Sequence, residues 1–240
     1  MRNAFLTFEH VEKKFPGRVA LSDISFDLPS GKVIGIIGPN GAGKSTMLKL
    51  MAGLLRPNKG KVLLEGKAIE RRSSEDIAYL PDQGGCYTFY TVAETLQFYK
   101  SIYADFDHQK ALEMIDFMQL ELHRNVGSLS KGNLTRLKMV TTLSRRAPLI
   151  LLDEPLSGLD PMIRESIIKG LIAFINFPEQ TVIMATHEVA EVEPILDMVI
   201  AIKDGGIVHI DDVENIRLNY ESSLVDWMKE LFQTNKNPLK

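Results

Sequence analysis

Residues 38–46 read Gly38-Pro39-Asn40-Gly41-Ala42-Gly43-Lys44-Ser45-Thr46, which fits the pattern G-x-x-x-x-G-K-[ST]. The apolar run Val33–Ile37 precedes this loop, and the helical pattern Ser45–Leu54 follows it. Glycines at this spacing let consecutive backbone N–H groups surround a phosphate chain, and the helix adds its positive N-terminal end. A glycine-rich turn with a surface lysine is the alternative. The order strand, loop, helix favours a phosphate-binding loop, with Lys44 on the β- and γ-phosphates and the Ser45 hydroxyl on Mg²⁺.

Short apolar runs alternate with longer helical patterns in the rest of the chain. The other predicted strands are Asp23–Leu28, Lys61–Leu64, Ile77–Leu80, Leu149–Leu152, Thr181–Ala185, Val199–Ile202 and Ile207–Ile210. The other predicted helices are Thr91–Tyr103, Gln109–Met118, Asn133–Ser144, Met162–Phe174 and Val189–Leu196. Such alternation predicts an α/β fold with a mostly parallel sheet. No strand pattern interrupts residues 84–145, so we expect a helical insertion there.

The composition argues against several classes of protein. The 240 residues are 45% hydrophobic and 25% charged, as in ordinary globular proteins. Lys and Arg number 28 against 31 Asp and Glu, and this balance disfavours nucleic acid as a partner. The single cysteine, Cys86, excludes an internal disulfide and a zinc site built on several thiolates. No apolar run approaches the roughly 20 residues of a membrane span, and residues 1–10 do not resemble a signal peptide, so we expect a cytoplasmic chain.

A second chemical motif follows a predicted strand. The run Leu149–Leu152 ends in the acidic pair Asp153 and Glu154. Near a phosphate loop, Asp153 can hold Mg²⁺ and Glu154 can polarise a water for attack on the γ-phosphorus. A solvated loop start is the alternative, and the upstream phosphate loop favours the catalytic interpretation.

The order of motifs resembles the ATP-binding subunit of ABC transporters. The matching motifs, besides the phosphate loop, are Gln83, Leu129-Ser130-Lys131-Gly132-Asn133, Asp153-Glu154, Ser157-Gly158-Leu159-Asp160 and His187. The resemblance spans residues 6–210. It implies a P-loop NTPase core with an N-terminal antiparallel β part and an inserted helical subdomain. It also implies one ABC-type ATPase domain over residues 1–240, with the core in 1–83 and 146–215, the helical subdomain in 84–145, and a C-terminal helix and tail in 216–240.

The resemblance implies a role for each matching residue. ATP and Mg²⁺ are the implied cofactors, with Ser45, Gln83 and Asp153 around the metal. Glu154, Gln83 and His187 are the implied catalytic residues, with His187 on the γ-phosphate. The implied nucleotide contacts are Phe15, Gly38, Asn40, Gly41, Gly43, Lys44, Ser45, Thr46, Ser130, Gly132 and Asp160.

Some of these residues have structural alternatives. Asp160 precedes Pro161 and can also cap a helix. Phe15 stands where the family stacks a ring on adenine, and a buried core phenylalanine is the alternative. His10, His108, His123 and His209 match no motif and are interpreted as structural or exposed.

The loop at residues 129–133 departs from the family pattern Leu-Ser-Gly-Gly-Gln. Lys131 replaces a glycine and Asn133 replaces the glutamine, whereas Ser130 and Gly132 are kept. Some bacterial exporters of the antibiotic-resistance type tolerate a lysine here. Together with the expected lack of a long C-terminal regulatory domain, Lys131 therefore favours export over import.

The resemblance implies a motor that works as a dimer. The binding site of ATP on one phosphate loop is completed by Ser130 and Gly132 of a second ATP-binding subunit, which is identical or different. Hydrolysis of the ATP then opens the dimer. Separate transmembrane permease subunits are the implied partners, with residues 84–92 as their contact or simply as packing of the helical insertion. The chain is then peripheral on the inner face of the membrane.

Three other functions compete with the motor. One is a soluble ABC-type switch in translation or DNA maintenance, which the acidic balance does not favour. Another is an unrelated phosphate-loop kinase or GTPase, which leaves residues 129–133, Glu154 and His187 unexplained. The last is a non-catalytic binding module, which the intact Lys44, Asp153, Glu154 and His187 disfavour.

Overall fold

The computed structural model describes residues 4–220 and 222–233 and contains two sheets. The larger sheet has the order β10-β9-β3-β8-β7-β6, and all its neighbouring strands are parallel except β10 and β9. Its strands are β3 (Val33–Ile37), β6 (Ile77–Leu80), β7 (Leu149–Asp153), β8 (Thr181–Ala185), β9 (Met198–Lys203) and β10 (Gly206–Asp212). Every residue of β3, β7 and β8 is buried, which confirms the expectation of a strand covered on both faces at 33–37.

The smaller sheet is antiparallel and has the order β2-β1-β4-β5. Its strands are β1 (Leu6–Phe15), β2 (Arg18–Leu28), β4 (Lys59–Leu64) and β5 (Lys67–Ala68). The sequence pattern predicted no separate strand at 6–15. The reason is a register shift between Phe8 and Val11, where His10 has a φ of +48° and breaks the alternation of buried and exposed residues.

The helices follow the predicted order, and two of them differ in extent from the prediction. They are α1 (Lys44–Met51), α2 (Val92–Ile102), α3 (His108–Phe117), α4 (Lys131–Leu143), α5 (Pro161–Phe174), α6 (Val189–Val192), α7 (Val213–Tyr220) and α8 (Leu224–Gln233). The first helix ends at Met51 rather than Leu54, because Gly53 has a φ of +68°. The predicted helix 189–196 becomes α6 and a 3₁₀ turn at Glu193–Ile195, since Pro194 cannot donate a backbone hydrogen bond.

The C-terminal part was predicted as one helix and a tail from residue 216, and this was wrong. Two helices, α7 over Val213–Tyr220 and α8 over Leu224–Gln233, lie in this part, and the tail at 234–240 lies outside the described residues. Trp227 of α8 is buried beside His209 of β10, with ring centroids 5.3 Å apart. This packing against β10 is a tertiary contact that no local sequence pattern reveals.

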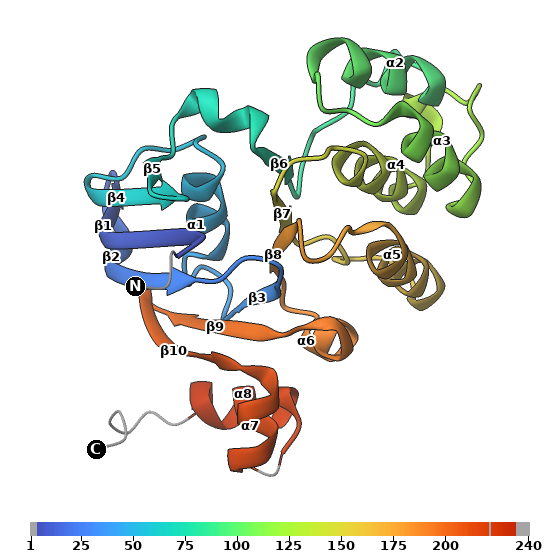
Figure 1. The fold of residues 1–240 in the computed structure, drawn as a ribbon. Coiled ribbons are helices and arrows are strands. Elements are labelled where there is room, and N and C mark those ends of the chain that lie inside the picture. Colours follow the sequence, from blue (N-terminus) through green and yellow to red (C-terminus); the bar gives the residue numbers. More distant parts are fainter. Residues whose placement is uncertain (1–3, 221, 234–240) are drawn as a thin grey trace.

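Helix α1 lies between the two sheets (Figure 1). Its Met47 and Leu48 share one core with Phe8 of the small sheet and Ile36 of the large one. The second core lies on the other side of the large sheet and includes Leu137 of α4 and Ile167, Leu171 of α5. Figure 1 shows α2, α3 and α4 together at one end of the molecule, away from the small sheet. The predicted P-loop NTPase architecture, with its antiparallel part and helical insertion, is therefore confirmed.

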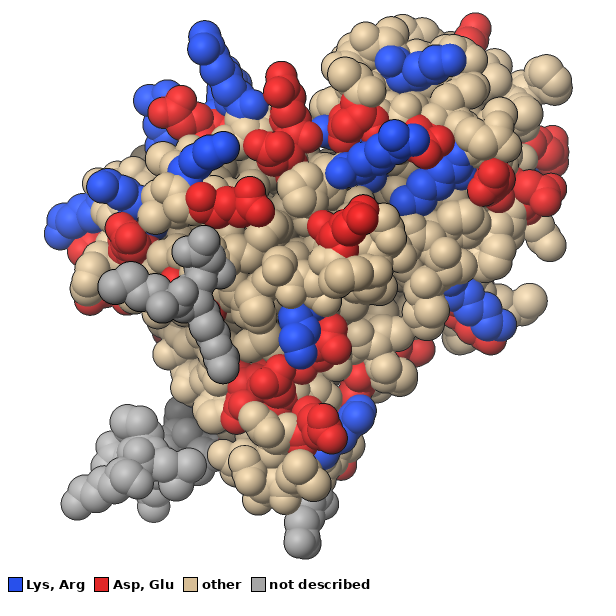
Figure 2. All heavy atoms as spheres, in the orientation of Figure 1, with Lys and Arg blue, Asp and Glu red and all other residues tan. Residues whose placement is uncertain are grey.

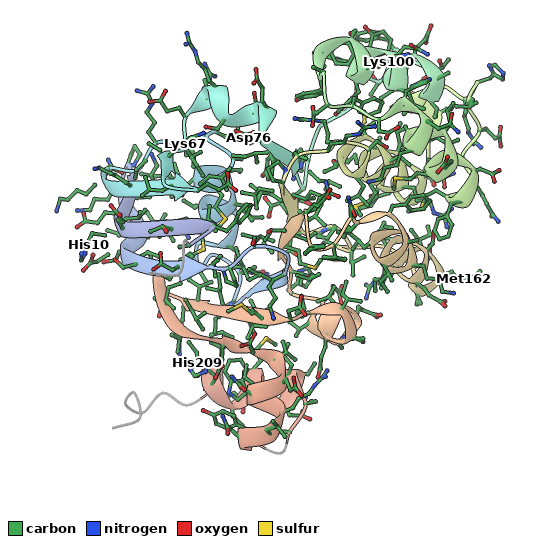
Figure 3. The ribbon with its side chains drawn as sticks, viewed as in Figure 1. His10, Lys67, Asp76, Lys100, Met162 and His209 are labelled. Carbon is green, nitrogen blue, oxygen red and sulfur yellow. The ribbon has the colours of Figure 1, made fainter. Side chains whose placement is uncertain are left out.

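The surface carries charges of both signs. Figure 2 shows Lys and Arg interspersed with Asp and Glu, with a group of acidic side chains over the region of β10 and the helices after it. His10 lies at the outer edge of the small sheet, and His209 lies on β10 beside the C-terminal helices (Figure 3). In the part of the chain that the structure describes, no helix has the length and apolar character needed to cross a membrane.

Candidate functional site

The loop at residues 38–43 connects the carboxyl end of β3 to the N-terminus of α1. Two of its glycines, Gly41 and Gly43, have φ values of +82° and +116°, a region that residues with a Cβ rarely adopt. Gly43 is also the N-cap residue of α1, and a Cβ there would lie 2.7 Å from the Ala20 carbonyl oxygen. The glycine at this position is therefore required both by its backbone angle and by the close approach of β2.

Replacing Gly43 with Ala is expected to lower the free energy of unfolding by about 3 kcal/mol, from backbone strain and the contact with Ala20. Gly66→Ala is the matched control, since Gly66 has a φ of +76° but nothing within 4 Å of an added Cβ. It is expected to cost only about 1 kcal/mol. Urea unfolding of the two variants measures the difference, and equal losses would contradict the close approach.

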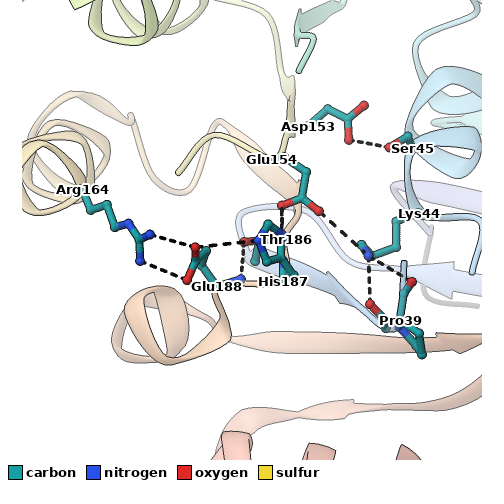
Figure 4. A network of polar contacts seen from close by, with 10 residues as sticks. Pro39, Lys44, Ser45, Asp153, Glu154, Arg164, Thr186, His187 and Glu188 are labelled. Atoms are coloured by element: carbon teal, nitrogen blue, oxygen red, sulfur yellow. Dashed lines mark hydrogen bonds and ion pairs between the residues drawn. The ribbon is translucent and has the colours of Figure 1, made fainter. Parts of the chain in front are cut away.

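Lys44 is the first residue of α1, and its side chain is only 6% exposed. Its ammonium donates to the carbonyl oxygens of Gly38 at 2.8 Å and Pro39 at 3.3 Å. It also lies 3.9 Å from Glu154 Oε1 (Figure 4). Burial lowers the pKa of Lys44, while the charges of Glu154 and Asp153 act in the opposite direction. The chain thus holds a desolvated cation at the loop, where an anionic ligand would be strongly attracted.

Asp153 ends β7 and is buried between two hydroxyl groups. The Ser45 hydroxyl donates to Oδ1 at 2.8 Å, and the Tyr79 hydroxyl donates to Oδ2 at 3.2 Å. Tyr79 lies on β6 opposite Leu151, two residues before Asp153, so both side chains are on the same face of the sheet. Burial and the negative charge of Asp153 raise the pKa of Tyr79, which keeps it a neutral donor.

Tyr79 was missed by the sequence analysis, because only the pairing of β6 with β7 brings it to Asp153. Replacing Tyr79 with Phe leaves one oxygen of a buried carboxylate without this donor. We expect the free energy of unfolding to fall by about 1–2 kcal/mol. Chemical denaturation checks the value, with Tyr220→Phe as the control because Tyr220 is partly exposed on α7. An unchanged stability of the Tyr79 variant would contradict the role of this hydrogen bond.

Glu154 has an unusual backbone conformation. Its φ is +51°, a left-handed conformation that costs of order 1–3 kcal/mol for a residue other than glycine. Its N–H donates to the Ala185 carbonyl oxygen at 2.8 Å, which ties the turn after β7 to the end of β8. This sharp turn directs the carboxylate toward both Lys44 and His187 (Figure 4).

His187 follows β8 and contacts Glu154 in two ways. Its Nδ1 lies 2.7 Å from Glu154 Oε2, and its backbone N–H donates to the same oxygen at 3.3 Å. The imidazole is partly exposed, so it is accessible from solvent. One cluster therefore lies at the carboxyl ends of β3, β7 and β8 and joins three different parts of the sequence. Its members are Lys44, Ser45, Asp153, Glu154 and His187.

The oxygen atoms of Ser45 and Asp153 suit a magnesium ion. Among residues 4–220 and 222–233, no group of three or more His, Cys, Asp or Glu side chains is arranged to hold a metal by itself. Mg²⁺ typically takes only one or two protein ligands and completes its shell with water and phosphate oxygens. A hydroxyl and a carboxylate 2.8 Å apart beside a phosphate loop therefore fit this ion.

Gln83 lies in the exposed loop after β6. Its side chain makes no hydrogen bond to other described residues. The backbone carbonyl groups of the two residues before it accept hydrogen bonds from a lysine of α4. Lys138, which is buried, donates to the oxygens of Pro81 at 3.4 Å and Asp82 at 3.1 Å. Cys86, farther along this loop, is a free cysteine whose burial raises its pKa to about 11.

Ser130, Gly132 and Asp160 lie at the starts of two helices. The Ser130 hydroxyl accepts from the Asn133 N–H at 3.2 Å and caps α4, and Asp160 accepts from the Ile163 N–H at 3.0 Å and caps α5. Gly132 is buried, and an added Cβ would lie 2.1 Å from Ile163 Cδ1. No hydrogen bond or ion pair among the described residues joins these groups to the Lys44 cluster.

One feature at the start of α4 could not be predicted from the sequence. The Lys131 ammonium lies beside Gly158, where an added Cβ would come within 2.3 Å of Nζ. Lys131, one of the two residues that depart from the family pattern, thus packs on the loop that follows Glu154 in the same chain.

Phe15 lies at the end of β1 and is 41% exposed, so it is not the buried core residue that the alternative required. The Lys13 ammonium is 5.3 Å from the centre of its ring. Arg18, just across the turn, donates to the Gly41 carbonyl oxygen of the phosphate loop. The remaining predicted residues of this region, Asn40 and Thr46, lie in the exposed loop and in the first turn of α1, respectively.

A family model described as "ABC transporter" matches residues 21–157, which is more than half of the chain. The chain belongs to the ABC transporter family. The lipopolysaccharide export system ATP-binding protein LptB of Haemophilus influenzae is 31% identical over 224 residues, covering 89% of this chain and 92% of that protein. An uncharacterised ABC transporter ATP-binding protein of Methanocaldococcus jannaschii is 29% identical over 214 residues, covering 87% and 78%.

Solved structures of ABC proteins share the fold. The ATP-binding subunit of an ABC transporter superposes with a TM-score of 0.83 at 23% identity, covering 95% of this chain and 99% of that one. A dimeric ATP-binding cassette in a post-hydrolysis state with ADP and Pi has a TM-score of 0.76 at 24% identity, covering 86% and 98%. The family assignment makes the chain an ATP-binding subunit of the ABC type and an ATPase, as the sequence predicted.

Proposed function

We propose that this ABC subunit is the motor of a transport complex, and that it binds ATP with Mg²⁺ at a dimer interface and hydrolyses it to drive membrane subunits. The observation that carries the proposal is the cluster of Lys44, Ser45, Asp153, Glu154 and His187. It combines a cation, a metal-binding oxygen pair and a carboxylate at one phosphate loop. Phosphoryl transfer requires such positioning and charge neutralisation.

Each residue of the cluster has a distinct role in this proposal. The phosphates are held by Lys44 and by backbone N–H groups of the phosphate loop. This loop includes Gly38, Asn40, Gly41 and Gly43, and Thr46 follows it in the first turn of α1. Ser45 and Asp153 would hold Mg²⁺, which would neutralise charge on the phosphate oxygens, and Gln83 would join them when the site closes. Glu154 accepts a proton from the attacking water, and His187 contacts the γ-phosphate.

The second half of the site comes from another ATP-binding subunit. Ser130 and Gly132 present a hydroxyl and backbone N–H groups at the start of α4, where phosphate oxygens are favoured. Asp160 lies in the loop that meets the opposite subunit, and Phe15 stacks on adenine. A dimeric cassette among the structural relatives supports pairing of two subunits, identical or different. Among the described residues, Ser130 and Gly132 make no hydrogen bond or ion pair with Lys44 of the same chain, which is consistent with completion across a dimer.

Membrane permease subunits are the proposed partners, with the aromatic group Tyr87, Phe89, Tyr90 and Phe98 as the contact. Phe89 is 69% exposed and Tyr87 is 52% exposed, although their rings pack on Tyr90 and Phe98 with centroids 4.7–5.8 Å apart. An ordered, exposed apolar surface is typical of a protein contact. It adjoins Gln83, so a partner here can respond to events at the nucleotide. No nucleic acid is expected, because acidic residues outnumber basic ones, 31 against 28.

The proposed organisation follows from these roles. We propose a core of residues 1–83 and 146–212 and a helical subdomain of residues 84–145. The C-terminal part begins with α7 at Val213 and not at the predicted residue 216, which lies inside this helix. The chain is then cytoplasmic and peripheral on the inner face of the membrane. We propose export as the direction, because of Lys131 and because the export-system relative shares 31% identity against 28% for a carnitine transport protein of Listeria monocytogenes.

Two measurements test this function. The purified chain is expected to release phosphate from ATP only when Mg²⁺ is present, and chelation by EDTA is expected to abolish the activity. Affinity purification from membranes is expected to recover a polytopic membrane protein. Recovery of ribosomes or DNA instead would favour the soluble switch, and absence of Mg²⁺-dependent hydrolysis would overturn the motor.

A further inference from the structure

Arg164 lies one turn into α5, directly after the loop Ser157–Asp160 that is proposed to meet a second subunit. Its side chain is largely buried, and its Nε donates to the Leu159 carbonyl oxygen at 2.9 Å. Its two terminal nitrogens bind both oxygens of Glu188, at 3.0 and 2.8 Å, and one of them lies 3.4 Å from Glu191. A bidentate pair of this kind fixes both position and orientation, unlike an exposed ion pair.

Glu188 is in turn attached to the segment that carries His187. Its N–H donates to the Thr186 hydroxyl at 2.9 Å, and its Oε1 lies 3.7 Å from His187 Nε2. The opposite nitrogen of the same ring, Nδ1, contacts Glu154 at 2.7 Å. The imidazole therefore lies between two carboxylates, one paired with Arg164 and the other facing Lys44 (Figure 4).

These contacts form a continuous path from the loop 157–160 to the phosphate loop. It runs from the Leu159 carbonyl through Arg164, Glu188, His187 and Glu154 to Lys44. Without Arg164, Glu188 would be an unneutralised carboxylate beside the imidazole and would compete with Glu154 for its N–H groups. Without Glu188, only the contacts with Glu154 would orient the ring.

We propose that Arg164 and Glu188 are positioning residues of this ATPase, which hold His187 on Glu154 and make its orientation depend on the position of the loop 157–160. The inference rests on the proposed function and deepens it. Neither residue touches the reacting atoms. A displacement of α5 when a second subunit docks would move the guanidinium, and through Glu188 it would move the His187 ring.

The test compares Arg164→Met, Glu188→Gln and the double variant in steady-state ATP hydrolysis. Each single variant is expected to lower kcat by about tenfold to a hundredfold, because a displacement of about 1 Å at a reacting group has effects of this size. The dissociation constant for ATP, measured by calorimetry, is expected to stay within about threefold of the parent value. The double variant is expected to be no slower than the slower single variant, since both substitutions break the same path.

Arg217→Met is the matched control. Arg217 of α7 pairs with Glu193 at 2.9 Å, on the 3₁₀ turn directly after α6, and it contacts no member of the path. This substitution removes an ion pair on the segment just after α6 but leaves the contacts of His187 intact. The kcat is therefore expected to remain within about twofold of the parent value. Thermal unfolding of all variants separates instability from mispositioning. If Arg164→Met does not fold, the kcat of Glu188→Gln relative to that of the control tests the proposal by itself.

Three results would overturn the positioning role. The first is a kcat of Glu188→Gln equal to that of the control. The second is a decrease in kcat of the double variant that equals the product of the two single decreases. The third is a decrease in kcat that parallels the decrease in melting temperature across the variants. Failure of the proposed function gives a different result, because the parent chain itself would then lack Mg²⁺-dependent hydrolysis.

Discussion

Glu154→Gln is expected to bind ATP, to lower kcat by about a hundredfold or more, and to accumulate as an ATP-dependent dimer. The amide has nearly the same shape as the carboxylate and can still accept a hydrogen bond from His187 Nδ1, which lies 2.7 Å from the native oxygen. It cannot accept a proton from water. It also removes a negative charge that faces Lys44 at 3.9 Å and would repel the γ-phosphate.

Light scattering coupled to size exclusion measures this dimer. With ATP, the Glu154 variant is expected to have twice the mass of the chain without nucleotide. Glu214→Gln is the control, because Glu214 is exposed on α7, and this variant is expected to behave as the parent does. A variant that remains monomeric with ATP would be incompatible with pairing of identical subunits and would favour a different partner subunit.

Lys44→Ala is expected to weaken ATP binding by at least about a hundredfold, because it removes the charge-assisted hydrogen bonds of a desolvated ammonium to phosphate. The fold is expected to survive. Burial lowers the pKa of Lys44, which means that the charged form is poorly solvated in the folded chain, so removing it relieves part of that cost.

Calorimetric titration with ATP and thermal unfolding with and without nucleotide measure both effects. Lys49→Ala is the matched control, since Lys49 is an exposed lysine on the same helix. The control is expected to keep the ATP-induced rise in melting temperature, whereas Lys44→Ala is expected to lose it. Undiminished ATP affinity of Lys44→Ala would refute the assignment of the phosphate loop.

Much of the architecture was predictable because it depends on neighbouring residues. An uninterrupted apolar run such as Val33–Ile37 predicts a strand with two buried faces, and the structure confirms this. The N-terminal strand was harder, because the register shift at His10 breaks its alternation. The C-terminal helices depended on packing of Trp227 against β10, so their number was predicted wrongly.

The residues of the candidate site also fall into two groups, those that the sequence motifs named and those that only the structure revealed. The sequence motifs named Lys44, Ser45, Asp153, Glu154 and His187 as members of one site, although their roles stay predictions. Tyr79 could not be found, because its contact with Asp153 joins residues 74 positions apart through the pairing of two strands. Arg164 and Glu188 carry no motif of their own in the sequence analysis, and only the docking of α5 beside α6 brings them together.

The phosphate loop at residues 38–46 could be predicted from the order of its residues alone. Its glycines, its lysine and its hydroxyl act through their own backbone angles and their immediate neighbours, so the spacing of residue types suffices to predict it. Which side chains face that loop depends on how distant segments of the chain pack together. The contact of Ser45 with Asp153 spans 108 positions and that of His187 with Glu154 spans 33. Such contacts depend on strand order and on the left-handed turn at Glu154, and neither is encoded in a local pattern.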